Sequence, residues 1–236
     1  MTLALFLAVI FLSVFVQSVV GFGSALFTMA ILAPLMGVTL AAPVVALFTL
    51  SLEIVLLLIY HQSLSFKAVW QITAASLLGV PLGILALKEL PEQLILFALG
   101  LIMVSYALYA LSNLKLPELH SSGWAYGFGF LAGILGGAYN TSGPPVIVYG
   151  NCRGWAPDEF KANLQGFFFV SSLVVTAGHF LGGNVTAEVW RYTLWCLPMI
   201  ALGVVAGVWL SKRISVQVFR KLVLGMLVIL GASLMI

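Results

Sequence analysis

The chain has 236 residues, of which 62% are apolar and 7% are charged, whereas a soluble domain contains roughly 45–50% apolar and about 25% charged residues. This composition excludes an ordinary soluble protein and indicates an integral membrane protein in contact with the lipid bilayer. The formal net charge of +3 comes from Lys and Arg residues in short loops and at the ends of apolar runs, where they report topology and not nucleic-acid binding.

An interruption divides the first apolar segment, residues 3–37, at Gln17-Ser18-Val19-Val20-Gly21-Phe22-Gly23-Ser24. A continuous helix over this segment would be about 52 Å long at ~1.5 Å per residue. This length is too great for one crossing of ~30 Å of hydrocarbon and too small for two crossings and a turn. We therefore predict a helix that breaks at the glycines and returns to the side from which it came. No basic residue precedes the segment, which indicates a retained segment and not a cleaved signal peptide.

Three longer apolar runs follow at residues 40–60, 69–87 and 94–111, and each approaches or exceeds the roughly 20 residues that cross a bilayer as a helix. Glu53 lies well inside the first run and has no basic residue within a helical turn of it. An ionisable group at that depth is a functional candidate. Glu53 could carry a coupling proton, or it could be a neutral glutamic acid held by hydrogen bonds in a structural role.

Residues 113–123 are linker-like, and a second interrupted segment, residues 124–151, comes after them. It contains Gly136-Gly137-Ala138-Tyr139-Asn140-Thr141-Ser142-Gly143-Pro144-Pro145, and it would measure about 42 Å as a continuous helix. We expect it to break and return as the first segment does. Three further apolar runs, residues 160–181, 189–210 and 216–236, complete the chain.

The chain looks duplicated, because residues 78–88 align with residues 202–212 in the same register. The charges of the matched loops differ, since Lys88-Glu89 is neutral where Lys212-Arg213 is doubly positive. Two copies of opposite orientation explain this difference, because each collects basic residues only in loops that face the cytoplasm.

We therefore predict an all-α integral membrane protein made of two inverted repeats. Residues 1–112 would form the first transmembrane repeat, residues 113–123 a linker and residues 124–236 the second repeat. Each repeat would contain a re-entrant hairpin of broken helices and three transmembrane helices. Both termini would then lie outside the cell.

The two breaks are the predicted substrate site. Backbone freed at a break survives inside a membrane only where it is buried in protein or lines a cavity, and helix packing alone would not require Asn140-Thr141-Ser142 there. The N-terminus of each returning half-helix offers free N–H groups and the positive end of a dipole, which favour an anion. The expected substrate-binding residues are Gln17, Gly21, Phe22, Gly23, Ser24, Tyr139, Asn140, Thr141, Ser142, Gly143 and Gln165.

The residue types at the breaks also predict local conformation. Ser24 would cap the first returning half-helix, and Thr141 or Ser142 would cap the second. Pro144 and Pro145 suit a first helical turn, where an N–H group is spare. The glycines that could supply positive φ or a close approach of the backbone at the breaks are Gly21, Gly23, Gly136, Gly137 and Gly143.

Several of these residues have an ordinary alternative role. Gln17 and Gln165 could form hydrogen bonds between helices, and Phe22 and Tyr139 could simply pack. Two small-residue patterns are interpreted as helix-packing contacts and not as ligand contacts, namely Gly79/Gly83 and Gly203/Gly207.

Arg153 and Lys161 bracket the loop between the second broken segment and the run that follows it. They could draw anions towards an entrance, although solvation of the loop is the usual role of such residues.

The sequence lacks the motifs of ATP-driven or hydrolytic proteins. It contains no Gly-x-x-x-x-Gly-Lys-Ser/Thr phosphate loop, no His-Glu-x-x-His zinc motif and no Gly-x-Ser-x-Gly elbow. Its two cysteines, Cys152 and Cys196, are too few for a metal cluster or a disulfide scaffold. We expect no enzyme activity, no catalytic residue, no metal and no cofactor, and a gradient as the energy source.

The sequence resembles the TauE/SafE family of sulfite and organosulfonate exporters, also called the TSUP family, over nearly the whole chain. The resemblance implies transport of small sulfur-containing or organic acid anions, in a bacterial inner membrane. The stretch Ala138-Tyr139-Asn140-Thr141 departs from the family, in which glycine with an apolar or aromatic residue is more usual. The residues that carry the resemblance are Val20-Gly21-Phe22-Gly23-Ser24 and Pro34-Leu35-Met36-Gly37 in the first half, and residues 127–137, Ser142-Gly143-Pro144-Pro145, Arg153-Gly154 and Phe160-Lys161-Ala162 in the second.

These observations predict a secondary transporter of a small anion, and the resemblance implies that it is an exporter. Glu53 would couple transport to protons, and one repeat would rock against the other. Two alternatives are an anion channel with the same site and a membrane scaffold that transports nothing. The sequence leaves the oligomeric state open, with a homodimer among the outcomes.

Overall fold

The computed structural model describes residues 2–112, 114 and 117–236. Met1 and three residues of the predicted linker, Asn113, Lys115 and Leu116, lie outside the described residues. The described residues form helices and no strand, so the all-α prediction is confirmed. In chain order the helices are α1 (Leu3–Val20), α2 (Ser24–Met36), α3 (Val38–Tyr60), the short 3₁₀-helix η1 (His61–Ser63), α4 (Phe66–Glu89), α5 (Glu92–Leu111), α6 (Trp124–Tyr139), α7 (Gly143–Cys152), α8 (Pro157–Leu181), α9 (Ala187–Ser211) and α10 (Val216–Ser233).

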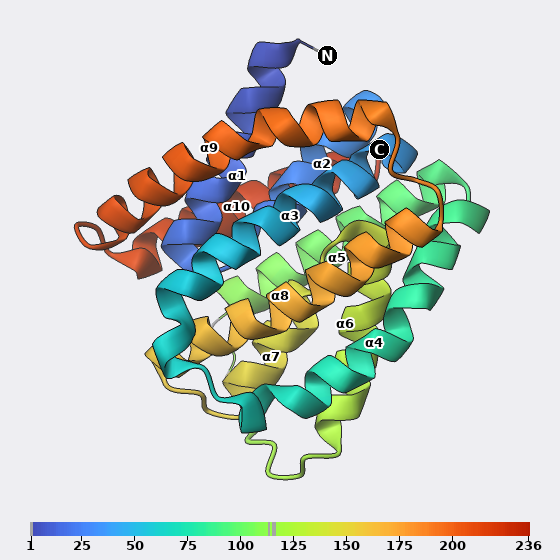
Figure 1. The fold of residues 1–236 in the computed structure, drawn as a ribbon. Coiled ribbons are helices and arrows are strands. Elements are labelled where there is room, and N and C mark those ends of the chain that lie inside the picture. Colours follow the sequence, from blue (N-terminus) through green and yellow to red (C-terminus); the bar gives the residue numbers. More distant parts are fainter. Residues whose placement is uncertain (1, 113, 115–116) are drawn as a thin grey trace.

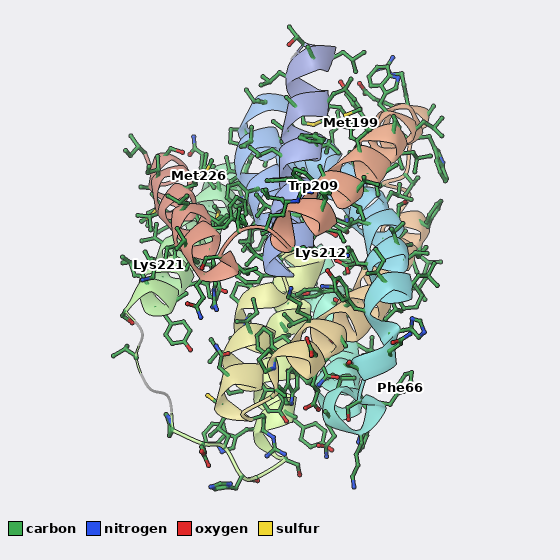
Figure 2. All side chains as sticks on the ribbon, turned by 90° about the vertical axis from the view of Figure 1, so that its left-hand side faces the viewer. Phe66, Met199, Trp209, Lys212, Lys221 and Met226 are labelled. Carbon is green, nitrogen blue, oxygen red and sulfur yellow. The ribbon has the colours of Figure 1, made fainter. Side chains whose placement is uncertain are left out.

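Seven of the described helices are long and apolar enough to cross a membrane, namely α1, α3 with η1, α4, α5, α8, α9 and α10. Large apolar side chains project from their outer surfaces, as lipid contact requires. Phe66 on α4 and Trp209 on α9 are 76% and 53% exposed, and Figure 2 shows both on the outside of the helix assembly. The multi-pass membrane architecture is therefore confirmed.

The second broken segment forms a hairpin that returns to its starting end. The backbone N–H of Leu119, just before α6, donates to the carbonyl of Cys152 at the end of α7, at 2.9 Å. The chain thus enters along α6 and comes back along α7, as Figure 1 shows. We call the end of the molecule that holds Leu119 and Cys152 the linker end.

The first broken segment returns to the opposite end. Phe6 at the start of α1 packs on Tyr192 at the start of α9, with 5.0 Å between the ring centroids. The N–H of Val38, just after α2, donates to Glu92 at the start of α5, at 2.8 Å. Lys88, four residues before Glu92, reaches the carbonyl of Gly182 just after α8. Since α8 begins beside the linker end and α9 follows Gly182, these contacts together define the opposite end.

Helices of the two halves pack in matching pairs. Helix α4 lies along α6, and α9 lies along α1. The close approach depends on small residues: Gly79 and Gly83 lie against the backbone of α6, while Gly203 and Gly207 lie against α1. An added Cβ at any of them would collide with the neighbouring helix, so the predicted packing role of both glycine pairs is confirmed.

Candidate substrate site between the two breaks

The two breaks meet at one cavity in the interior. Its volume is about 30 Å³, measured as the space open to the centre of a water molecule, which is room for roughly two waters. A larger solute requires the surrounding helices to move. The cavity is lined by Gln17, Phe22, Gly23, Ser24, Ala25 and Leu26 from the first break, by Asn140, Thr141, Ser142 and Gly143 from the second, and by Thr49, Glu53, Phe168 and Ser172 from α3 and α8.

The backbone of each break turns through left-handed residues. Gly21 and Gly23 have φ of 94° and 108°, values that glycine adopts without strain. In the second break the left-handed residue is Asn140, with φ of 55°, and Asn is one of the few other residues that tolerate this region. The expectation of positive φ was therefore right for Gly21 and Gly23. The remaining three glycines do not have positive φ, because Gly136 and Gly137 lie inside α6 and Gly143 begins α7. Gly137 instead permits the close approach of two helices, since an added Cβ there would collide with the backbone of α4.

Gln17 links the first break to Glu53. Its side-chain Nε2 donates to Glu53 Oε1 at 2.5 Å. Its Oε1 accepts from the backbone N–H of Ser24 at 3.1 Å and also from the Ser24 hydroxyl. One buried amide thus joins a carboxyl group on α3 to the first turn of α2, and Glu53 is only 3% exposed. Its second oxygen, Oε2, has no hydrogen-bond partner among the described residues.

The capping predictions were wrong in detail. Gly23 and not Ser24 occupies the N-cap position of α2, without a side-chain capping bond, and the side chain of Gln17 accepts the N–H of Ser24, the first residue of the helix. Ser142 stands at the N-cap position of α7 without a side-chain capping bond, and the Thr141 hydroxyl donates to the carbonyl of Tyr139. Pro144 lies in the first turn of α7, as predicted.

Both half-helix N-termini keep free donors. Among the described residues, the N–H groups of Ala25 and Leu26 on α2 and of Ser142 and Gly143 on α7 have no hydrogen-bond partner. Each N-terminus carries the positive end of a helix dipole, about half an elementary charge. The cavity lining contains no Lys, Arg or His. The positive potential in this cavity therefore comes from backbone groups.

Three predicted site residues, Gly21, Tyr139 and Gln165, are not part of the cavity lining. Gln165 is fully buried on α8 and its Nε2 donates to the carbonyl of Gly21 at 2.9 Å, which supports the first break. Tyr139 is the last residue of α6 and is also buried. Asn140, which does line the cavity, ties the second break to α3 through a bond from its Nδ2 to the carbonyl of Ala42 at 2.9 Å.

The two residues predicted at the entrance have different surroundings. Arg153 donates from one guanidinium nitrogen to the carbonyls of Leu119 and His120, which anchors the exposed chain before α6. Lys161 lies beside the first break, with its aliphatic stem against Gly21. Its ammonium group stands 5.8 Å from the ring centroid of Tyr60, a cation–π contact. An entrance role for either residue stays a prediction.

Sequence reasoning missed Thr49, Phe168 and Ser172. The signal that could have found them is the spacing between the halves. The end of α1 at Val20 and that of α6 at Tyr139 are 119 residues apart, and the starts of α3 and α8 differ by the same number. The same offset relates Thr49 to Phe168 and Glu53 to Ser172. Among the described residues, no group of three or more His, Cys, Asp or Glu could hold a metal ion.

The comparisons with known proteins agree with this architecture. The family model described as "Sulfite exporter TauE/SafE" matches residues 5–234. A curated protein of Cupriavidus necator, described as "Probable sulfite/organosulfonate exporter TauE", is 28% identical over 229 residues, which cover 93% of this chain and 88% of that protein. No solved structure matches the chain. These comparisons give no support to the homodimer.

Proposed function

The chain belongs to the TauE/SafE family of sulfite exporters, and we propose that it is a secondary transporter that exports sulfite, an organosulfonate or a related small anion across the cell membrane. Family membership places it among transporters and not among enzymes. The observation that carries the proposal is the meeting of both helix breaks at one buried cavity.

We propose that the substrate binds in this cavity through backbone N–H groups. The free donors of Ala25 and Leu26 face the site from one half of the chain, and those of Ser142 and Gly143 face it from the other. An oxyanion with several oxygens can accept from both sets at once, and the two dipoles favour its charge. A site without a fixed cation also releases its substrate more easily, which transport requires.

The two halves are proposed to be inverted repeats. The hairpin α1–α2 opens at one end of the molecule and α6–α7 opens at the linker end, while the tips of both reach the same cavity. Rocking of one repeat against the other would expose the cavity to each side in turn. The volume of about 30 Å³ is small for the substrate, so the helices around the cavity must move during transport.

The orientation follows from the basic residues. At the linker end lie Lys67, Arg153, Lys161, Lys212, Arg213, Arg220 and Lys221, while Lys88 and Arg191 lie at the opposite end. By the positive-inside rule, this distribution supports the proposal that the linker end faces the cytoplasm and that both termini lie outside.

Glu53 is the proposed proton-coupling residue. An ionised Glu53 in the cavity wall repels an anion, whereas a protonated Glu53 does not. Binding of the anion and of the proton are therefore linked, and each favours the other. Gln17 transmits the charge state of Glu53 to the first turn of α2, because its amide contacts both groups.

Flux in proteoliposomes tests the proposal. Purified protein is reconstituted, and the movement of radiolabelled sulfite, organosulfonates and short carboxylates is measured with and without an imposed pH gradient. We expect flux of at least one sulfur oxyanion above that of protein-free liposomes, and a response to the gradient. A flux that carries uncoupled current and ignores pH would indicate the channel. If the protein moves none of the anions tested, the proposal that it is a transporter is wrong.

A further inference from the structure

Two polar side chains that do not line the central cavity contact the ring of Phe22. The guanidinium carbon of Arg220, in the second turn of α10, stands 5.7 Å from the ring centroid of Phe22. Tyr106 of α5 meets the same ring edge-on, with 5.9 Å between centroids. Phe22 also lines the central cavity, whereas Arg220 and Tyr106 do not.

Arg220 is half-buried, and the hydroxyl of the buried Tyr106 lies close to its guanidinium group. The described residues include all seven acids of the chain, and none of their carboxylates forms an ion pair with Arg220. The Nε of Arg220 is buried and has no hydrogen-bond partner among the described residues. The same holds for the hydroxyl of Tyr106, whose side chain is 4% exposed. Two unsatisfied polar groups therefore flank one aromatic ring.

Arg220 also faces a cavity of about 200 Å³ at the linker end, where α5 and α7 end and α10 begins. Its lining consists of Tyr109, Ala110, Leu114, Asn151 and Arg220, so a guanidinium group, a side-chain amide and a phenolic hydroxyl supply its hydrogen-bond donors. A guanidinium with no carboxylate partner binds an oxyanion through paired N–H groups.

We propose that Arg220, together with Tyr106 and Asn151, forms a receiving site for the transported oxyanion at the linker end, and that the Phe22 ring is the barrier between this site and the central cavity. The inference rests on the proposed function. It differs from the predicted entrance, because the guanidinium of Arg153 is occupied by the carbonyls of Leu119 and His120. Displacement of the Phe22 ring would open a path from the fixed cation to the helix N-termini.

The kinetics of sulfite flux in proteoliposomes test this site. Arg220→Gln should raise the KM for sulfite about tenfold while kcat changes far less, because a charge-assisted contact made on entry is lost. Arg220→Lys should recover part of the loss. Lys221→Gln is the matched control, since it removes the same charge from the next residue, which is exposed on α10 (Figure 2). We expect it to change KM by less than about twofold.

Tyr106→Phe provides a second variant that keeps the ring and removes only the unpartnered hydroxyl. It should raise the KM for sulfite severalfold with unchanged thermal stability. If Arg220→Gln does not fold, this variant alone tests the receiving site. If Arg220→Gln and Tyr106→Phe both retain the KM of Lys221→Gln, the receiving site is wrong while the transporter stands. If the wild-type protein moves none of the anions, both proposals fall.

Discussion

Gln17 and Glu53, 36 residues apart and on different helices, are joined by a hydrogen bond of 2.5 Å in the wall of the central cavity. The same amide accepts the N–H of Ser24 at the start of α2. The charge of one carboxyl group is thereby coupled to the donors of one half-helix, which is the arrangement that proton-linked binding of an anion requires.

Glu53→Gln should abolish the response of transport to a pH gradient, because the site then has a fixed neutral side chain. Exchange of labelled for unlabelled anion at equal pH should persist, since the N–H donors remain. The measurement compares gradient-driven flux with exchange in the same proteoliposomes. Glu89→Gln, which neutralises an exposed acid at the end of α4, is the control. Undiminished gradient-driven flux in Glu53→Gln would exclude the coupling role.

Gln17→Met should destabilise the protein by about 2–4 kcal/mol, because the Ser24 N–H and Glu53 both lose a buried partner while the side-chain volume is kept. Ser24→Ala should cost about 1 kcal/mol, since the backbone N–H bond to Gln17 survives. Unfolding of both variants in the same detergent measures the difference. Equal stability of the two variants would show that the Gln17 bridge is not a major support of the break.

Much of this architecture could be predicted from the sequence, since apolar length fixes the spans and Gly21 and Asn140 mark the breaks. The hydrogen bond between Gln17 and the start of α2 could not be predicted, because Gln17 reaches Ser24 only after the chain has turned at Gly23. Thr49 and Ser172 stand on uninterrupted helices, and their exposure to the cavity depends on how α3 and α8 cross. In the sequence, Arg220 indicated only on which side of the membrane its end of the helix lies. Its relation to Phe22 depends on α10 packing beside the first break.

Asn140→Ala should lower stability by about 2 kcal/mol or more, because it removes the bond to the carbonyl of Ala42 and places Ala at positive φ. Asn140→Gly loses the same bond but adopts this φ without strain. We therefore expect Asn140→Gly to be the more stable variant by about 1 kcal/mol. Thermal unfolding of the two purified variants gives the comparison, and the reverse order would contradict the left-handed conformation of Asn140.

Gly83→Ala should destabilise the pair of α4 and α6 by about 1–3 kcal/mol, since its Cβ would collide with the backbone around Ile134 and Ala138. Gly127→Ala is the matched control on α6, because a Cβ there meets nothing within 4 Å. It should be neutral or stabilising by up to about 1 kcal/mol through helix propensity. Should Gly83→Ala prove as stable as Gly127→Ala, the close approach of α4 and α6 would be wrong.

The opposed orientation of the two repeats predicts which loops an impermeant thiol reagent reaches. In a background with both native cysteines replaced by Ser, Lys67→Cys and Lys212→Cys should react only from the cytoplasmic side, because both lie at the linker end. Glu89→Cys and Glu188→Cys, at the opposite end, should react from outside. Labelling of intact cells and of inverted membrane vesicles makes the measurement. All four side chains are exposed, so a failure to label reflects sidedness. If Lys67→Cys and Lys212→Cys react from different sides, the second broken segment crosses the membrane and does not return as proposed, and the inverted-repeat arrangement is wrong.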